Sequence, residues 1–123
     1  MNFHDLGAQY QALKTEIDAG IADVIGKGHF ILGEQVGELE SRLAQDVGRK
    51  YCVTCANGTD ALVLLLRLWG VGPGDAVFAP DFTYFASAGC AAAVGATAVP
   101  VDIDLATFNL SPDALEEATE FIL

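Results

Sequence analysis

Basic residues are scarce in this chain. It has 6 lysines and arginines against 17 aspartates and glutamates, which gives a net charge of −11 over 123 residues. Nucleic acids and anionic membrane surfaces recruit Lys and Arg, so this balance argues against both as partners. Only Arg49-Lys50 forms even a basic pair. We therefore expect neither a nucleic-acid interface nor a membrane interface.

The sequence also lacks a long apolar run and a targeting signal. Its longest run, residues 61–66, is far shorter than the roughly 18 residues that a membrane span needs. The first ten residues include His4, Asp5 and Gln9, and they carry no apolar core preceded by positive charge. We expect a cytoplasmic protein.

Cysteine is represented by Cys52, Cys55 and Cys90 alone. The C-x-x-C spacing of the first two occurs in redox and zinc sites. However, no second C-x-x-C or histidine pair completes a zinc site, and residues three apart on a strand point to opposite faces. We expect small buried thiols and no metal.

Apolar residues, in contrast, make up 52% of the chain, enough for the core of one ordinary globular domain. Their periodicity predicts helices over 10–25, 35–47, 59–69 and 86–94, strands over 51–55, 76–80 and 97–101, and a last helix that starts at Pro112 after an N-capping Ser111. Strands that alternate with helices favour an α/β fold with a parallel sheet and right-handed crossovers.

Several helices have faces that should be buried. The helix over 10–25 carries one apolar stripe, and the helix over 59–69 is apolar all round, which is typical of burial on more than one side. The helix over 35–47 should turn these residues inward: Val36, Leu39, Leu43 and Val47. The apolar loop over 29–34 either lines a pocket or partner surface, or simply covers the core.

The segment Asn57-Gly58-Thr59 follows a predicted strand and opens a helix. The first N–H groups of a helix are unpaired and carry the positive end of its dipole, so a phosphate could bind there. Asn57 could equally be an ordinary N-cap, with Asp60 reaching back as in a capping box. The sequence has neither G-x-G-x-x-G nor G-K-[ST] here, so both interpretations stay open.

Polar and aromatic residues also follow the other two predicted strands, at 81–85 and 102–104. Because ligands of parallel sheets bind beyond the carboxyl ends of the strands, all three segments are expected at one edge.

Motifs along nearly the whole chain resemble one family, the DegT/StrS-type nucleotide-sugar aminotransferases, which have fold type I and depend on pyridoxal 5'-phosphate (PLP). The motifs are Phe30-Ile31-Leu32-Gly33 and those at 55–62, 72–75, 80–84, 95–97, 101–104 and 107–110. The resemblance implies a three-layer αβα architecture and the parallel-sheet start of the PLP-binding large domain. It further implies a homodimer that transfers an amino group, from glutamate, to a keto nucleotide-sugar for surface polysaccharide or amino-sugar biosynthesis.

The resemblance also assigns roles to residues. Gly58, Thr59 and Asp60 would hold the PLP phosphate, and Tyr84 would stack on the pyridine ring and fix its plane. The loop with Phe30, Ile31 and Gly33 would lie near the nucleotide-sugar pocket at the dimer interface. Among subgroups, the similarity is greatest to enzymes that aminate 3-keto sugars of UDP-linked hexuronic acids.

The chain departs from the family in its lysines. The Schiff-base lysine and the acid at the pyridine nitrogen lie downstream of Leu123 in the family, and Lys14, Lys27 and Lys50 do not match the lysine motif. We therefore expect an N-terminal portion, with helices and a substrate loop over 1–50 and an incomplete large domain over 51–123. Alone it should be inactive and, with unpaired strand edges, marginal or oligomeric.

Two other interpretations of the chain stay open. The chain could be a non-catalytic module that binds a phosphorylated ligand or a partner protein, or a truncated inactive product.

Overall fold

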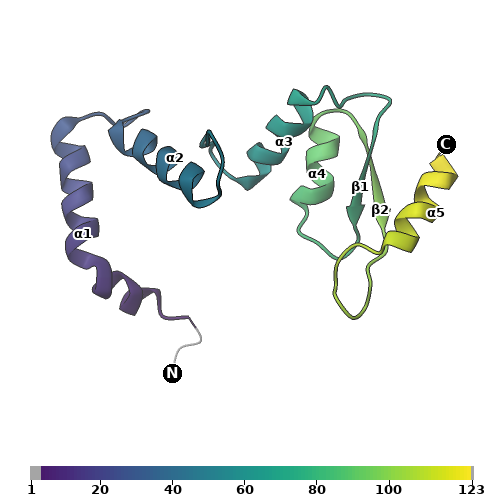
Figure 1. The fold of residues 1–123 in the computed structure, drawn as a ribbon, viewed down its shortest axis with the longest axis horizontal. Helices are drawn as coiled ribbons and strands as arrows, with labels where there is room; N and C mark the ends of the chain where they lie inside the picture. The colour runs from purple at the N-terminus through teal and green to yellow at the C-terminus, as the bar shows by residue number, and fades with distance from the viewer. Residues whose placement is uncertain (1–3, 123) are drawn as a thin grey trace. The chain divides into compact units, whose positions relative to one another are not determined.

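A computed structural model describes residues 4–122 of the protein. The chain divides into two compact units, Met1–Thr54 and Cys55–Leu123, each described here by itself. Within the described range the elements follow in this order (Figure 1): α1 (Leu6–Lys27), α2 (Glu34–Asp46), α3 (Gly58–Leu68), β1 (Ala76–Pro80), α4 (Ala86–Ala93), β2 (Thr97–Val101) and α5 (Pro112–Ile122).

Helix α1 confirms the helix predicted over 10–25 and extends it at both ends. Asp5 caps its start by accepting a hydrogen bond from the Ala8 N–H at 2.9 Å. Gly28 ends it in the left-handed region, with φ 68°, and donates to the Val24 carbonyl at 3.0 Å. The apolar stripe of α1 stays exposed in the described chain, because nothing in its own unit covers it.

Helix α2 was also predicted, but of the four side chains expected to face inward, Val36 is partly buried and the other three are exposed. Leu39, Leu43 and Val47 are 49%, 40% and 65% exposed, and the buried residue of this helix is Ala44. The larger side chains have no packing surface opposite them among the described residues of this unit, whereas the small Ala44 is covered by its neighbours. The prediction of those side chains as inward-facing was therefore wrong for the described chain.

Residues 51–55, predicted as a strand, form none in the structure. A strand needs a hydrogen-bonded neighbour, and the described residues offer this segment none. The Thr54 N–H instead donates to the Glu40 carboxylate at 2.8 Å, and the Thr54 hydroxyl donates to the same oxygen at 2.9 Å. These bonds lower the pKa of Glu40, chiefly through the backbone N–H of Thr54.

The second unit contains the sheet. β1 and β2 pair in parallel from Ala76↔Thr97 to Pro80↔Val101, with α4 as the crossover between them, and their bounds agree with the predicted strands. Helix α4 packs on both strands and α5 packs on β2, and the two helices lie on opposite sides of the strands (Figure 1). The core is built from small residues: Ala79, Ala86, Cys90, Ala91, Ala96 and Val101.

The outer edge of β2 is blocked by proline. The Thr97 N–H donates to the Asp75 carbonyl and the Asp81 N–H donates to the Val101 carbonyl, both at 2.9 Å, so Thr97 and Val101 face β1. Successive residues of a parallel strand point their backbone groups to alternate sides, and Pro100 therefore faces away from β1, where it has no N–H to offer. Prolines of this kind occupy edge strands. On β1 the outward-facing residues are Ala76, Phe78 and Pro80, so its outer edge also ends in a proline but keeps the N–H groups of Ala76 and Phe78.

Helix α3 packs on α4. The prediction that it is buried on more than one side was wrong for the described chain, since Leu64, Leu65 and Leu68 are 56%, 44% and 79% exposed. The reason is that α4 covers one face of α3, and no other helix or strand in this unit packs closely on the rest.

The cysteines only partly follow expectation. Cys90 is buried, Cys52 is half-buried and Cys55 is exposed, where its thiol donates to the Asn57 carbonyl at 3.3 Å. Cys55 is exposed because no strand among the described residues pairs with its segment. Among residues 4–122, no group of acidic, His and Cys side chains is arranged to hold a metal, and no helix is long and apolar enough to cross a membrane.

Gly95 provides a test of this packing. It lies between α4 and β2 with φ 83°, and a Cβ added there would lie 3.2 Å from Pro73 Cγ. Gly95→Ala should lower the free energy of unfolding by about 1–2 kcal/mol, because left-handed backbone is unfavourable for alanine. Denaturant titration followed by circular dichroism measures this.

Gly20→Ala is the control. Gly20 lies inside α1 with open space around its missing Cβ, so alanine should raise helix stability there by about 1 kcal/mol. Equal stabilisation by both substitutions would contradict the backbone assignment at Gly95.

Candidate functional site

The N-terminus of α3 is capped by Asn57. Its backbone is extended, its side-chain oxygen accepts from the Asp60 N–H at 2.9 Å, and its carbonyl accepts from the Ala61 N–H at 3.1 Å. The cap thus confirms the local prediction for Asn57. Among residues 4–122, no acceptor is placed against the N–H groups of Gly58 and Thr59, which leaves two donors at the positive end of an 11-residue helix.

Asp60 behaves differently from the capping-box prediction. Its carboxylate accepts from the side-chain amide of Asn57 at 3.1 Å, and does not bond the backbone N–H of Asn57. The extended backbone of Asn57 places its side-chain amide over the first turn of α3. There the amide NH₂ group donates to the Asp60 carboxylate and the amide oxygen accepts from the Asp60 N–H. The two hydrogen bonds between Asn57 and Asp60 hold the cap in place. Because one of them uses the Asp60 N–H, the N–H groups of Gly58 and Thr59 are the available donors.

This end of α3 is open to an anion. Gly58, Thr59 and Asp60 are all exposed, and a Cβ built on Gly58 would meet nothing within 4 Å. A phosphate group matches such a place in charge and in hydrogen-bonding need, since it has only acceptor oxygens at neutral pH. The residues present therefore fit the phosphate end of PLP.

Tyr84 belongs to the segment that joins β1 to α4. The segment is anchored at one end by the Asp81–Val101 hydrogen bond and at the other by the Ser87 N–H, which donates to the Tyr84 carbonyl at 3.0 Å. The hydroxyls of Thr83 and Ser87 also lie 2.9 Å apart. The Tyr84 side chain is 79% exposed and lines a hollow of about 230 Å³ with residues of both strands, including Ala79, Ala98 and Pro100. A flat ring could stack on Tyr84 without displacing the core.

The structure brings these residues to one end of the second unit. Helices α3, α4 and α5 all begin at the end toward which β1 and β2 run (Figure 1). The N-terminus of α3 and the Tyr84 segment therefore lie at the same end, as expected for a parallel sheet.

A second loop follows β2 at this end, where residues 102–104 were expected, but the sequence assigned it no specific role. Asp104 accepts hydrogen bonds from the N–H groups of Ala106 and Thr107 at 2.9 and 2.8 Å, and these, chiefly the one from Thr107, lower the pKa of its carboxyl group. Phe108 lies in the left-handed region with φ 58°, and its ring is 5.6 Å from that of Phe82. The contact joins residues 26 positions apart, and no local pattern in the sequence indicates it.

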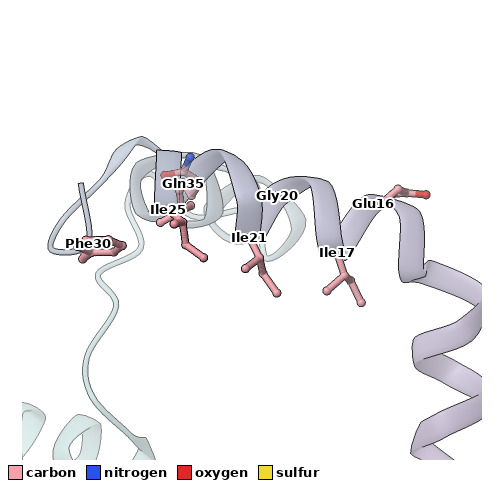
Figure 2. Close-up of a pocket in the computed structure, with 8 residues that line it drawn as sticks. Glu16, Ile17, Gly20, Ile21, Ile25, Phe30 and Gln35 are labelled. Carbon is pink, nitrogen blue, oxygen red and sulfur yellow. The ribbon is translucent and has the colours of Figure 1, made fainter. Parts of the chain in front are cut away.

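The other predicted residues belong to the first unit. Phe30 lines an open apolar groove of about 550 Å³ along α1, with Ile17, Ile21, Val24 and Ile25 (Figure 2). Ile31 is 87% exposed, so this segment does not cover the core of its unit. Gly33 is required by space, because a Cβ there would lie 2.8 Å from the His29 carbonyl oxygen.

Comparison with known proteins identifies relatives over nearly the full chain. Residues 11–121 match the profile of the DegT/DnrJ/EryC1/StrS aminotransferase family. UDP-2-acetamido-2-deoxy-3-oxo-D-glucuronate aminotransferase of Pseudomonas aeruginosa is 53% identical over 118 residues, which are 96% of this chain and 33% of the relative.

Solved structures agree. A DegT DnrJ EryC1 StrS aminotransferase from Brucella abortus superposes with a TM-score of 0.91 and 44% identity over 94% of this chain and 31% of its own. A sugar aminotransferase from Streptococcus pneumoniae, in its PLP form, gives a TM-score of 0.76 and 41% identity over 80% of this chain and 25% of its own.

The chain spans about a third or less of these relatives. The helices and the small parallel sheet are those of PLP aminotransferases, as the sequence motifs predicted. The chain belongs to the DegT/DnrJ/EryC1/StrS aminotransferase family.

Proposed function

We propose that this chain is the N-terminal part of a PLP-dependent aminotransferase that transfers an amino group from glutamate to a UDP-linked 3-oxo-hexuronic acid. The observation that carries the proposal is the pair of unused N–H donors at the start of α3, at the end of the unit where Tyr84 also lies. The choice of sugar is supported by 53% identity to an enzyme named for such a substrate.

Each residue has a part in this proposal. The N–H groups of Gly58 and Thr59 bind the phosphate, the Asn57–Asp60 pair holds those donors in place, and the Tyr84 ring packs on the pyridine ring and sets its plane. Bound PLP supplies the electron sink that makes a bond to the amino-acid α-carbon labile. Fixing the ring plane decides which bond stands perpendicular to it.

The remaining assignments concern the whole protein. Residues 1–50 supply helices and the loop with Phe30, Ile31 and Gly33 that contacts the nucleotide-sugar, and residues 51–123 begin the cofactor-binding large domain. The exposed apolar stripe of α1 supports a homodimer, because such a surface favours association. A cytoplasmic location fits two charged substrates, a nucleotide-sugar and glutamate.

A chimeric enzyme tests the function. This chain would replace the corresponding third of the Pseudomonas aeruginosa relative, and mass spectrometry would follow conversion of the 3-oxo sugar with glutamate as donor. We expect amination at a rate within about ten-fold of the parent enzyme, which serves as the control. A folded chimera that retains PLP but aminates none of the sugar would favour a non-catalytic phosphate-binding module.

Gly58 tests the phosphate site. Gly58→Pro removes one donor without breaking α3, because proline suits the first helical position and the extended backbone of Asn57 tolerates a following proline. Loss of one charge-assisted hydrogen bond, worth about 1.5–3 kcal/mol, should weaken PLP binding by about ten-fold or more in the chimera. Equilibrium dialysis measures this.

Gly58→Ala is the matched control, since it keeps the N–H and its Cβ enters open space. Equal PLP affinity in the proline and alanine variants would place the phosphate elsewhere.

Tyr84 tests the ring contact. Tyr84→Ala should weaken PLP binding by about ten-fold, the upper range for one aromatic stacking contact, whereas Tyr84→Phe should keep most of the affinity. The same dialysis, repeated with inorganic phosphate as competitor, separates ring from phosphate contacts. If both variants bind PLP as the parent chimera does, Tyr84 does not stack on the cofactor.

A further inference from the structure

The loop between β2 and α5 is closed on itself by main-chain bonds. Ile103 and Leu110 form an antiparallel bridge, the Asp104 N–H donates to the Asn109 carbonyl at 2.9 Å, and the Ser111 N–H donates to the Asp102 carbonyl at 3.0 Å. One end of the loop continues from β2 and the other leads into α5. Its base is therefore fixed to the sheet.

Asp104 shapes the tip of this loop. Its carboxylate accepts from the N–H groups of Ala106 and Thr107, and its carbonyl accepts from the Phe108 N–H at 2.7 Å. These bonds curl residues 104–108 tightly enough that Phe108 takes a φ of 58°, which is unusual for a residue with a bulky side chain. Such backbone persists only where its surroundings hold it.

The Phe108 ring then packs on Phe82, with centroids 5.6 Å apart and planes tilted by 48°. Phe82 is two residues before Tyr84, in the segment between the Asp81 and Ser87 anchors. Both rings are more than half exposed, at 57% for Phe108 and 67% for Phe82, so the pair contributes little to the core. The contact nevertheless reaches the Tyr84 segment from a different loop.

From this geometry we infer that Asp104 is a positioning residue for Tyr84, acting through the Phe108–Phe82 ring pair. The carboxylate fixes the loop, the loop presents the Phe108 ring, and that ring holds Phe82 and with it the segment that carries Tyr84. The contact of Tyr84 with the cofactor rests on the proposed function, whereas the coupling between the two loops does not.

The coupling is tested in the 123-residue chain by fluorine NMR. The chain has three tyrosines, so labelling with 3-fluorotyrosine gives three signals, and Tyr84→Phe assigns one of them. Phe108→Asn removes the ring while asparagine tolerates left-handed backbone, so the loop keeps its fold. We expect the Tyr84 signal to move toward the value of the unfolded chain, with the Tyr10 and Tyr51 signals unchanged.

Two further variants distinguish positioning from general loss of structure. Asp104→Ala should move the Tyr84 signal in the same direction, and Asp104→Asn, which keeps one acceptor oxygen, should restore most of it. Leu105→Asn is the matched control, because Leu105 is in the same loop and 82% exposed. A Tyr84 signal unmoved by Phe108→Asn, or moved as far by Leu105→Asn, would overturn the proposal.

The chimeric enzyme provides the second measurement. Phe108→Asn should weaken PLP binding by up to about ten-fold, the limit set by one aromatic pair, and Phe108→Tyr should restore it. If the fluorine signal moves but PLP binding is unchanged in the Phe108→Asn and Tyr84→Ala variants alike, the loops are coupled and the proposed role of Tyr84 fails. If Tyr84→Ala alone weakens binding, the positioning proposal fails and the proposed function stands.

Discussion

The parallel pairing of β1 with β2 is the constraint on which the candidate site depends. It runs from Ala76↔Thr97 to Pro80↔Val101, and the Asp81 N–H extends it by donating to the Val101 carbonyl at 2.9 Å. Because both strands end at the same edge, the segments that follow them must leave side by side. That is why Phe82, after β1, meets Phe108, after β2, and why α4 can return along the strands and pack against α3.

The same sheet has two unlike edges. Each edge has one outward-facing proline without an N–H, Pro80 on β1 and Pro100 on β2, but the outer edge of β1 also offers the N–H groups of Ala76 and Phe78, whereas that of β2 offers the N–H of Ala98. Apolar side chains are also left uncovered on α1 and α3, and burying one leucine is worth about 1.5–3 kcal/mol. The described units therefore favour growth of the sheet beside β1 and association through their helices, both of which reduce exposed apolar surface.

Local chemistry predicted much of this fold. The strand at 76–80 follows a glycine-rich turn, and the strand at 97–101 follows Gly95. The Asn57 cap involves only the helix that it begins. Nearby residues therefore determine each of these features. Residues 51–55 failed as a strand because a strand is a relation between two segments, and the partner is not among the described residues. The Phe82–Phe108 contact was missed for a related reason, since it depends on strand order and on an unusual backbone at Phe108.

A net charge of −11 on the chain opposes the binding of a phosphate, which is also negative. The distance between the phosphate and each charged or donor group decides how strongly that group acts on it. Charges separated by more than about 8 Å are largely screened at physiological salt, whereas the N–H groups of Gly58 and Thr59 can touch the anion directly. Asp60 is the acid in the first turn of α3, and the Asn57 amide occupies one of its carboxylate oxygens at 3.1 Å. In the proposed site, the N–H groups of Gly58 and Thr59 would therefore act on the phosphate at shorter range than the acidic residues elsewhere on the chain.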